Sequence, residues 1–391
     1  MLQQNNKYTS IEDLKSDFLP HKNLQLNFRQ DKFQNLSQQE HLFFIKNLEK
    51  CKNVTNLQLL YKESDLIQQF LSDLKEIFSQ IIQLESLVFD LSKNKMDQQA
   101  INHLASGLQQ FKNLQRLSLD LGHCKIDAIS FQELGAAIFE SKALIKLEIF
   151  MRSNCLKDIG ASNLGKYLSG CTKLKNLNIH LVKNKICTKG FTQLIQGLKN
   201  CQQIQQLNLE LRQNFINYGD ISDFENLFSG MKNLQSLTLG LSKNQVNSQA
   251  IQNLTKSLIN CSALKKLALD LIDNQIGSQG TQSLVVNLSQ CQKLESLMLW
   301  LVENKIQTLG ASYLANQFLQ FQRLQNLQIW IGWNQIDNQG AECLGKGLRN
   351  CKQLKTLTFI FQYNNILKEK SNQLSRNLKK MIRLVKLNYK V

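Results

Sequence analysis

The chain has 391 residues, of which 47 are Lys or Arg and 30 are Asp or Glu, so its formal charge is +17 with neutral histidines. Hydrophobic residues make up 42% of the chain and charged residues 20%, a composition that can bury a large core and that argues against disorder. With one proline and 18 glycines, no stretch is typical of a flexible linker or a collagen-like tract. No window approaches the ~20 apolar residues of a membrane span, so we expect no transmembrane helix.

Residues 1–23 are expected to form a short lead-in or cap. The first twenty, MLQQNNKYTSIEDLKSDFLP, contain three acidic residues. They lack both the apolar core of a signal peptide and the acid-free, Arg-rich pattern of a transit peptide. We therefore expect an intracellular, cytoplasmic protein, for which association with the cytoskeleton or a cilium remains an open alternative.

From Val54 onward, an apolar residue recurs every 30 positions without one insertion. Behind each of these anchors runs the template L-x-x-L-x-L-x-L-x-x-N-x-I, and an irregular earlier copy begins at Leu24. These copies predict about thirteen repeats over residues 24–391. The anchors are Val54, Leu84, Leu114, Leu144, Leu174, Ile204, Leu234, Leu264, Leu294, Leu324, Leu354 and Leu384.

Each repeat has two halves with different periods. The alternation Leu-x-Leu-x-Leu predicts a strand with one buried face. The stretch after it spaces apolar residues four, four and three apart, at Gly190, Leu194, Leu198 and Cys201, which predicts a helix. One such unit cannot bury its apolar side alone, so neighbours must stack. Strands repeat at ~4.8 Å whereas packed helices need ~8–10 Å, so the stack should curve, with strands on the concave face and helices on the convex face.

This pattern resembles the leucine-rich repeats of the ribonuclease-inhibitor-like class. An additional x-Leu before each Asn is a consistent departure, and it predicts a strand about two residues longer than in that class. The resemblance implies one α/β leucine-rich-repeat solenoid over residues 24–391, with residues 367–391 as a basic terminal coil. It also implies that a buried Asn in each repeat bonds the backbone of adjacent turns. Cys124 takes this place once, and the other members of the column are Asn94, Asn154, Asn184, Asn214, Asn244, Asn274, Asn304, Asn334 and Asn364.

Six of the ten cysteines share one register, three residues before the anchor. Other repeats fill that place with Phe or Met, so we interpret it as an apolar packing column of reduced core thiols. No C-x-x-C pair occurs, which makes a zinc site improbable. The six are Cys51, Cys171, Cys201, Cys261, Cys291 and Cys351.

The sequence shows no arrangement of residues typical of catalysis. Its five histidines are dispersed, and it has neither a G-x-x-x-x-G-K-[ST] loop for phosphate nor a G-x-S-x-G turn for a nucleophilic serine. We therefore predict a non-enzymatic protein with no catalytic residue, no metal and no cofactor, and we expect no small-molecule substrate.

An apolar, aromatic patch is predicted on the solvent side of the last third of the strands. Trp300 and Trp330 are one period apart, so they should stand side by side on neighbouring strands. Exposed aromatic residues on a rigid sheet are typical of protein-binding hot spots. The alternative is that the rings stack on each other and are covered by the chain or merely tolerated. The candidate partner-binding residues are Trp300, Trp330, Trp333, Met298, Val302, Ile272 and Ile360.

The last 25 residues carry eight basic residues and one acidic residue. Such a segment attracts acidic surfaces, mainly by steering them, although solvated charge that deters strand addition is an equally good explanation. The candidate basic surface consists of Lys368, Lys370, Arg376, Lys379, Lys380 and Arg383.

Together these features predict a scaffold that binds partner proteins through its concave face and basic edge, as a subunit of a larger assembly. The expected partner is a protein with an acidic surface, and no membrane is involved. Nucleic acid is less favoured, because aromatic residues do not interleave with the basic run. Two alternatives stay open: an RNA-binding or ribonuclease-controlling protein, suggested by the resemblance and the charge, and a GTPase-activating protein of the leucine-rich-repeat type, suggested by the resemblance alone.

Overall fold

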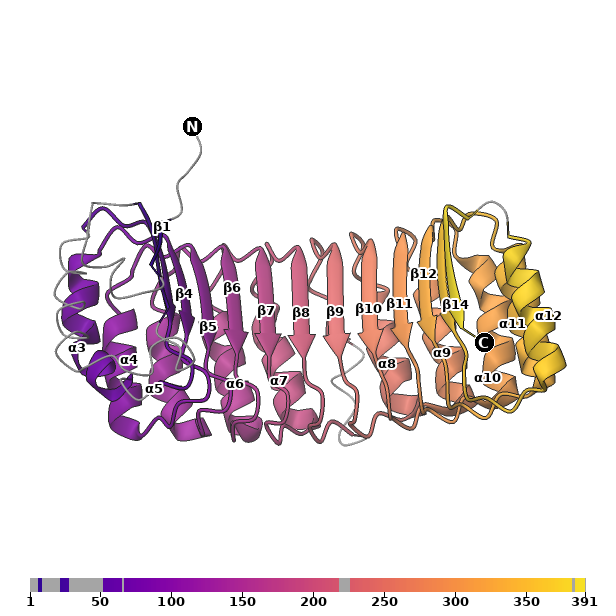
Figure 1. The fold of residues 1–391 in the computed structure, drawn as a ribbon, viewed down its shortest axis with the longest axis horizontal. Coiled ribbons are helices and arrows are strands. Elements are labelled where there is room, and N and C mark those ends of the chain that lie inside the picture. The colour runs from indigo at the N-terminus through magenta and orange to yellow at the C-terminus, as the bar shows by residue number, and fades with distance from the viewer. Residues whose placement is uncertain are drawn as a thin grey trace. The chain divides into compact units, whose positions relative to one another are not determined.

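The computed structural model describes residues 6–8, 22–27, 52–64, 67–217, 226–381 and 384–390. It divides into two compact units, residues 1–184 and 185–391. In each of them a parallel sheet is built from strands in chain order, and the helices between the strands cover one face of that sheet (Figure 1). The α/β leucine-rich-repeat architecture predicted from the sequence is therefore confirmed.

In the first unit, strand follows strand through the sheet in the order of the sequence. Consecutive helices pack against each other, as α3 does against α4 and α4 against α5. The strands are β1 (Asn6–Tyr8), β2 (Asn23–Asn27), β3 (Asn56–Leu60), β4 (Ser86–Asp90), β5 (Arg116–Asp120), β6 (Lys146–Phe150) and β7 (Asn176–His180), and the helices are α3 (Ile67–Gln80), α4 (Gln98–Leu108), α5 (Ala128–Ile138) and α6 (Lys157–Leu168).

The second unit repeats the arrangement with more regular spacing. Its strands are β8 (Gln206–Glu210), β9 (Ser236–Gly240), β10 (Lys266–Asp270), β11 (Ser296–Trp300), β12 (Asn326–Trp330), β13 (Thr356–Ile360) and β14 (Lys386–Lys390). Its helices are α7 (Thr188–Leu198), α8 (Ser248–Leu258), α9 (Gly277–Ser289), α10 (Gln307–Gln317), α11 (Asn338–Asn350) and α12 (Lys368–Lys379), and a 3-10 turn, η2 (Phe318–Gln320), follows α10.

Residues one period apart become neighbours on adjacent strands. Leu237 lies opposite Leu267, which in turn lies opposite Leu297. All three are buried, whereas Thr238, Ala268 and Met298, the next residues along the three strands, are half-buried, so the predicted alternation of these strand positions is confirmed. Burial of these leucine layers is the main stabilising contribution to each repeat.

The asparagine column satisfies backbone groups where the strands end. Asn274 is buried, and its side-chain oxygen accepts a hydrogen bond from the Val246 amide at 3.0 Å. Its Nδ2 donates to the carbonyl oxygens of Leu241 and Leu271, both at 3.0 Å. These groups have no strand partner at this point, so the column replaces the sheet ladder with side-chain bonds. The predicted structural role of this column is confirmed.

Several helices begin at a residue that caps the first turn. Asp97 precedes α4 and accepts a hydrogen bond from the Ala100 amide, and Asp337 precedes α11 and accepts one from the Gly340 amide at 3.0 Å. Such a cap satisfies an amide that has no partner inside the helix. The cap therefore fixes where the strand-exit turn gives way to the helix.

The cysteine column packs inside the core, as predicted. Its described members, Cys171, Cys201, Cys261, Cys291 and Cys351, are all buried, while Cys51 lies outside the described residues. Burial raises the pKa of Cys261 to about 12 and that of Cys291 to about 11. Thiols with such pKa values are neutral at physiological pH and are poor nucleophiles.

Strand β1 lies inside the segment predicted as a lead-in or cap. It pairs in parallel with β2, with Asn6 opposite Leu24. No repeat of the leucine template marks it in the sequence. Among the described residues, no helix combines the length and the apolar character that crossing a bilayer requires.

Candidate protein-binding surface

One row of side chains runs across all the strands of the second unit at their last position. It lies on the sheet face, defined here as the face of the β8–β14 sheet opposite the helices. Each residue of the row is the register partner of the next one. The central row consists of Glu210, Gly240, Asp270, Trp300, Trp330, Ile360 and Lys390.

Trp300 and Trp330 form a stacked pair in the middle of the central row. Their ring centroids are 5.1 Å apart and their ring planes are inclined by 17°. Both side chains are half-buried, so the adjacency expected from the 30-residue period is confirmed. Stacked indoles of this kind present a large, rigid, apolar surface at low entropic cost.

The other predicted patch residues lie at solvent-facing positions around this pair. Met298 is two residues before Trp300 on β11, and Val302 is two residues after it. Ile272 follows the end of β10, and Ile360 ends β13 opposite Trp330. All four are half-buried. The structure therefore brings the predicted patch together on one face of four neighbouring strands.

Trp333 belongs to a second aromatic stack at the strand exit. It lies 4.5 Å from Tyr363 between ring centroids, with an interplanar angle of 20°. Trp333 is 55% exposed and Tyr363 is 67% exposed. Trp330 and Trp333 come from the same repeat, with Trp330 at the end of β12 and Trp333 three residues after it.

Both residues of this second stack have a left-handed backbone, with φ of 57° for Trp333 and 63° for Tyr363. The same φ recurs at this place in every earlier repeat of the second unit, where polar residues occupy it. Bulky aromatic residues are uncommon in this conformation and cost energy there, so their presence points to a role beyond folding. The polar residues at this place are Gln213, Lys243, Asp273 and Glu303.

Tyr363 was not among the residues predicted from the sequence. Its signal is nevertheless present, because it follows Trp333 by exactly one period. Comparing equivalent positions immediately before the asparagine column, and not only at the strand ends, would have identified it. We define the aromatic patch as Trp300, Trp330, Trp333 and Tyr363.

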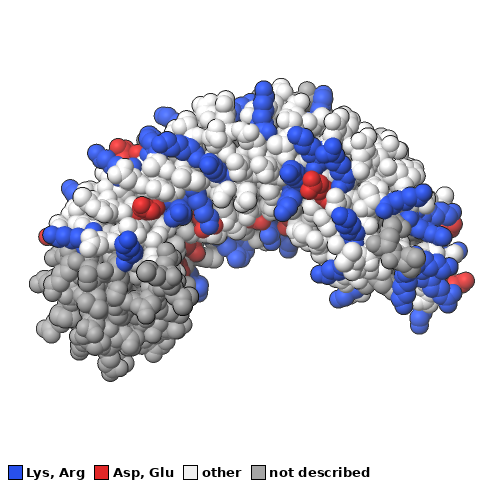
Figure 2. All heavy atoms as spheres, turned by 90° about the horizontal axis from the view of Figure 1, so that it is seen from above, with Lys and Arg blue, Asp and Glu red and all other residues white. Residues whose placement is uncertain are grey.

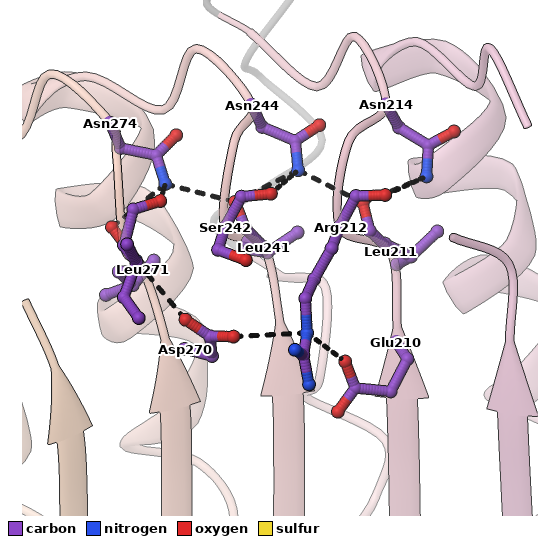
Figure 3. Close-up of polar contacts among 11 residues, drawn as sticks. Glu210, Leu211, Arg212, Asn214, Leu241, Ser242, Asn244, Asp270, Leu271 and Asn274 are labelled. Atoms are coloured by element: carbon purple, nitrogen blue, oxygen red, sulfur yellow. Dashed lines mark hydrogen bonds and ion pairs between the residues drawn. The ribbon is translucent and has the colours of Figure 1, made fainter. Parts of the chain in front are cut away.

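A charged cluster occupies the central row beside the aromatic patch (Figure 3). Arg212 Nε donates a hydrogen bond to Glu210 Oε2 at 2.8 Å and lies 3.1 Å from Asp270 Oδ2. Gly240 stands between the two acids, and a Cβ at that position would collide with the Glu210 carboxylate. The glycine therefore makes room for the bridge across three strands.

Burial raises the pKa of Asp270 above its usual range, although the Ile272 amide and Arg212 both act in the opposite direction. The hydrogen bond to Glu210 raises the pKa of Arg212. Arg212 was not among the residues predicted from the sequence. Its pairing with both acids depends on side-chain directions that periodicity alone does not define.

The predicted basic surface lies on the last helix. Lys368, Arg376, Lys379 and Lys380 are exposed and Lys370 is half-buried, whereas Arg383 lies outside the described residues. Helix α12 buries only Leu374 and Leu378, so most of its surface is presented to solvent. Figure 2 shows a dense group of Lys and Arg side chains at the end of the chain that carries α12. On β14, the central-row residue Lys390 and Lys386, at the other end of the strand, are also exposed.

The equivalent row in the first unit is built differently. Phe150 and His180 lie 4.7 Å apart between ring centroids. Asp90 and Asp120 each accept a hydrogen bond from the amide two residues further along, at 3.0 Å and 2.9 Å. Burial is the main cause that raises the pKa of Asp120. These aspartates close the strand ends, so their presence has a structural explanation.

No protein-family model and no curated protein sequence matches the chain. Among solved structures, an internalin (inlF) from Listeria monocytogenes is similar to it. The two sequences are 18% identical, the match covers 83% of this chain and 88% of the internalin chain, and the TM-score is 0.40. Within the part of the chain that the structure describes, no group of three or more His, Cys, Asp or Glu side chains is placed to hold a metal ion.

Proposed function

We propose that the chain is a non-enzymatic protein-interaction scaffold, similar to the ribonuclease-inhibitor-like repeats and formed by one solenoid domain over residues 24–391. A partner protein docks on the aromatic patch. The basic terminal coil binds an acidic surface, either on that partner or on another subunit of the assembly. A cytoplasmic location within a larger assembly is part of this proposal.

The observation that carries the proposal is the presence of two aromatic stacks, one at the ends of β11 and β12 and one in the turns that follow β12 and β13. Two of the four rings are more than half exposed. Exposed aromatic residues that are already held in place lose little conformational entropy on binding, which is why such residues dominate protein interfaces. The charge of the adjacent coil adds attraction for acidic partners.

The experiment compares partner retention by the tagged chain and by a W300A/W330A double variant, measured by quantitative mass spectrometry after affinity purification from the source cells. We expect at least about tenfold lower retention of the main partner, because hot-spot residues contribute on the order of 2 kcal/mol each. The variant should unfold at nearly the same temperature, since both indoles are half-buried on the sheet face and lie outside the leucine layers.

Phe150→Ala is the matched control, because Phe150 occupies the equivalent row position in the first unit and also stacks on a neighbour. This variant should retain the partner. Equal retention by the wild type and the double tryptophan variant would remove the aromatic patch as the docking site.

The RNA-binding and GTPase-activating alternatives have no specific observation in their favour. For RNA binding, Trp300 and Trp330 stack on each other and do not alternate with the basic residues of α12. For GTPase activation, the Arg212 guanidinium is already paired with the Glu210 and Asp270 carboxylates. A steep fall of RNA affinity with salt, or accelerated nucleotide hydrolysis by a candidate GTPase, would be required to support either one.

A further inference from the structure

The central row changes character from one end to the other. It starts with the acidic cluster at Glu210 and Asp270, continues through the two tryptophans and Ile360, and ends at Lys390. Because every step is a register partner of the previous one, this order is fixed by the fold. A partner that covers the row must therefore match acidic, apolar and basic positions in that order.

At the first end, one negative charge is left over. Glu210 and Asp270 contribute two carboxylates and Arg212 one guanidinium, and both carboxylates pair with this one guanidinium. The acidic side chains are only 9% and 11% exposed, whereas that of Arg212 is 48% exposed. A largely buried charge that lacks full compensation is unfavourable, so a cation from a partner would stabilise the cluster.

Trp300 provides the second contact for such a cation. It is the register partner of Asp270, and its indole stacks on Trp330 across the sheet. The opposite face of Trp300 is therefore turned toward the β10 strand and its carboxylate. A Lys or Arg side chain placed there would lie between a carboxylate and an aromatic face, the arrangement that cation–π contacts favour.

At the other end, the row becomes basic. Ile360 is the register partner of Lys390, which is exposed and is the last residue of the row. An acidic side chain of the partner would be attracted to this end of the row. The same side chain placed next to Asp270 would be repelled.

We infer that the central row binds an extended partner segment in which a basic residue, two apolar residues and an acidic residue follow one another on the same face. This deepens the proposed function and rests on it. The basic residue lies at Asp270 and Trp300, the apolar residues cover Trp330 and Ile360, and the acidic residue lies at Lys390.

The spacing of the strands gives the length of this segment. Asp270 and Lys390 are four strand steps apart. At ~4.8 Å per step the row spans about 19 Å, and an extended chain rises about 3.3 Å per residue. The basic and acidic residues should therefore be about six positions apart, with the apolar residues at the alternate positions between them.

The test is a random library of linear 12-residue peptides displayed on phage and selected on the full chain, after removal of phage that also bind W300A/W330A. We expect enriched peptides with the basic–x–apolar–x–apolar–x–acidic pattern, read in either chain direction. In fluorescence anisotropy, reversing the charge of either terminal residue of a selected peptide should weaken binding at least about tenfold.

Variants of the chain test which of its residues cause the preference for a basic and for an acidic peptide residue. E210Q/D270N should remove the selection for a basic residue, and Lys390→Glu should replace the acidic preference by a basic one. Lys266→Glu is the matched control, because Lys266 is exposed on β10 but lies outside the central row, and it should leave the pattern unchanged.

Each outcome distinguishes the inference from the proposed function. Tryptophan-dependent peptides without the charge order would leave the docking patch in place and overturn the ordered segment. A basic and an acidic residue about 13 positions apart in longer peptides would indicate a helical occupant and would also overturn it. Failure to select any tryptophan-dependent peptide would count against both proposals.

Discussion

At the residue scale, the asparagine column shows how one side chain replaces several backbone bonds. Asn154 accepts from the Ile126 amide and donates to two carbonyl oxygens. Cys124 occupies the same column one repeat earlier, where its thiol donates to Leu91 O at 3.2 Å. Burial raises the pKa of this thiol to about 12, so it acts as a neutral, weak donor. Cys124 therefore makes weaker hydrogen bonds to the backbone than the asparagines of this column.

We predict that Cys124→Asn stabilises the protein. The new side chain would accept from the Met96 amide, the counterpart of Ile126, and would donate to both Leu91 and Leu121. Net hydrogen bonds contribute about 1 kcal/mol each, so the free energy of unfolding should rise by roughly that amount. Chemical denaturation checks this, with Asn154→Ala as the opposite control, which should lose about 1–3 kcal/mol. Lower stability of Cys124→Asn would show that this turn does not accommodate the amide.

At the element scale, neighbouring helices approach so closely that some positions exclude a side chain. Gly347 of α11 faces the backbone of α10, and a Cβ there would lie 2.7 Å from the Ala315 Cα. Gly345 of the same helix faces only the end of the Leu374 side chain, at 2.8 Å. The close approach of α10 thus explains why glycine occupies position 347.

We predict that Gly347→Ala destabilises the protein although alanine favours helix. The intrinsic gain is about 1 kcal/mol, but separating two packed backbones costs about 1–3 kcal/mol and disturbs the leucine layers beneath. Gly345→Ala should be close to neutral, because the Leu374 side chain can move. The unfolding temperatures of both variants, compared with that of the wild type, test this prediction. A higher unfolding temperature for Gly347→Ala would contradict the close approach of α10 and α11.

At the scale of the whole chain, the 30-residue period was sufficient to predict the repeat, the buried strand positions and the Trp300–Trp330 contact. The period defines which residues become neighbours, and each of these three features depends on that alone. The hydrogen bonds of the asparagine column were instead implied by the resemblance to leucine-rich repeats. The Arg212 bridge could not be predicted in this way, since it depends on side-chain rotamers and on the space left by Gly240. The left-handed residues before each asparagine also escaped prediction, because polar residues and even Trp333 occupy a conformation that usually signals Gly or Asn.

If the repeats are interchangeable units, an exact period can be removed without loss of the fold. Deletion of residues 261–290 removes β10 and α9 and joins Asn260 to Cys291, so that every remaining residue keeps its place in the template. Strand β11 would then pair with β9, and α10 would pack on α8. We expect native-like helix content per residue, one cooperative unfolding transition for the shortened unit, and tryptophan emission close to that of the full chain.

A deletion of residues 261–275 is the appropriate control, because it removes a strand and its exit turn and shifts the rest by half a period. This variant should unfold without cooperativity, since leucines of the following strands would meet helix positions of the preceding repeat. The exact deletion also places Gly240 beside Trp300, which removes Asp270 from the central row but keeps both tryptophans. Binding of apolar peptides should survive in it while the selection for a basic residue is lost. If the two deletions behave alike in denaturation, the stacking of equivalent residues at 30-residue intervals is not what holds the second unit together.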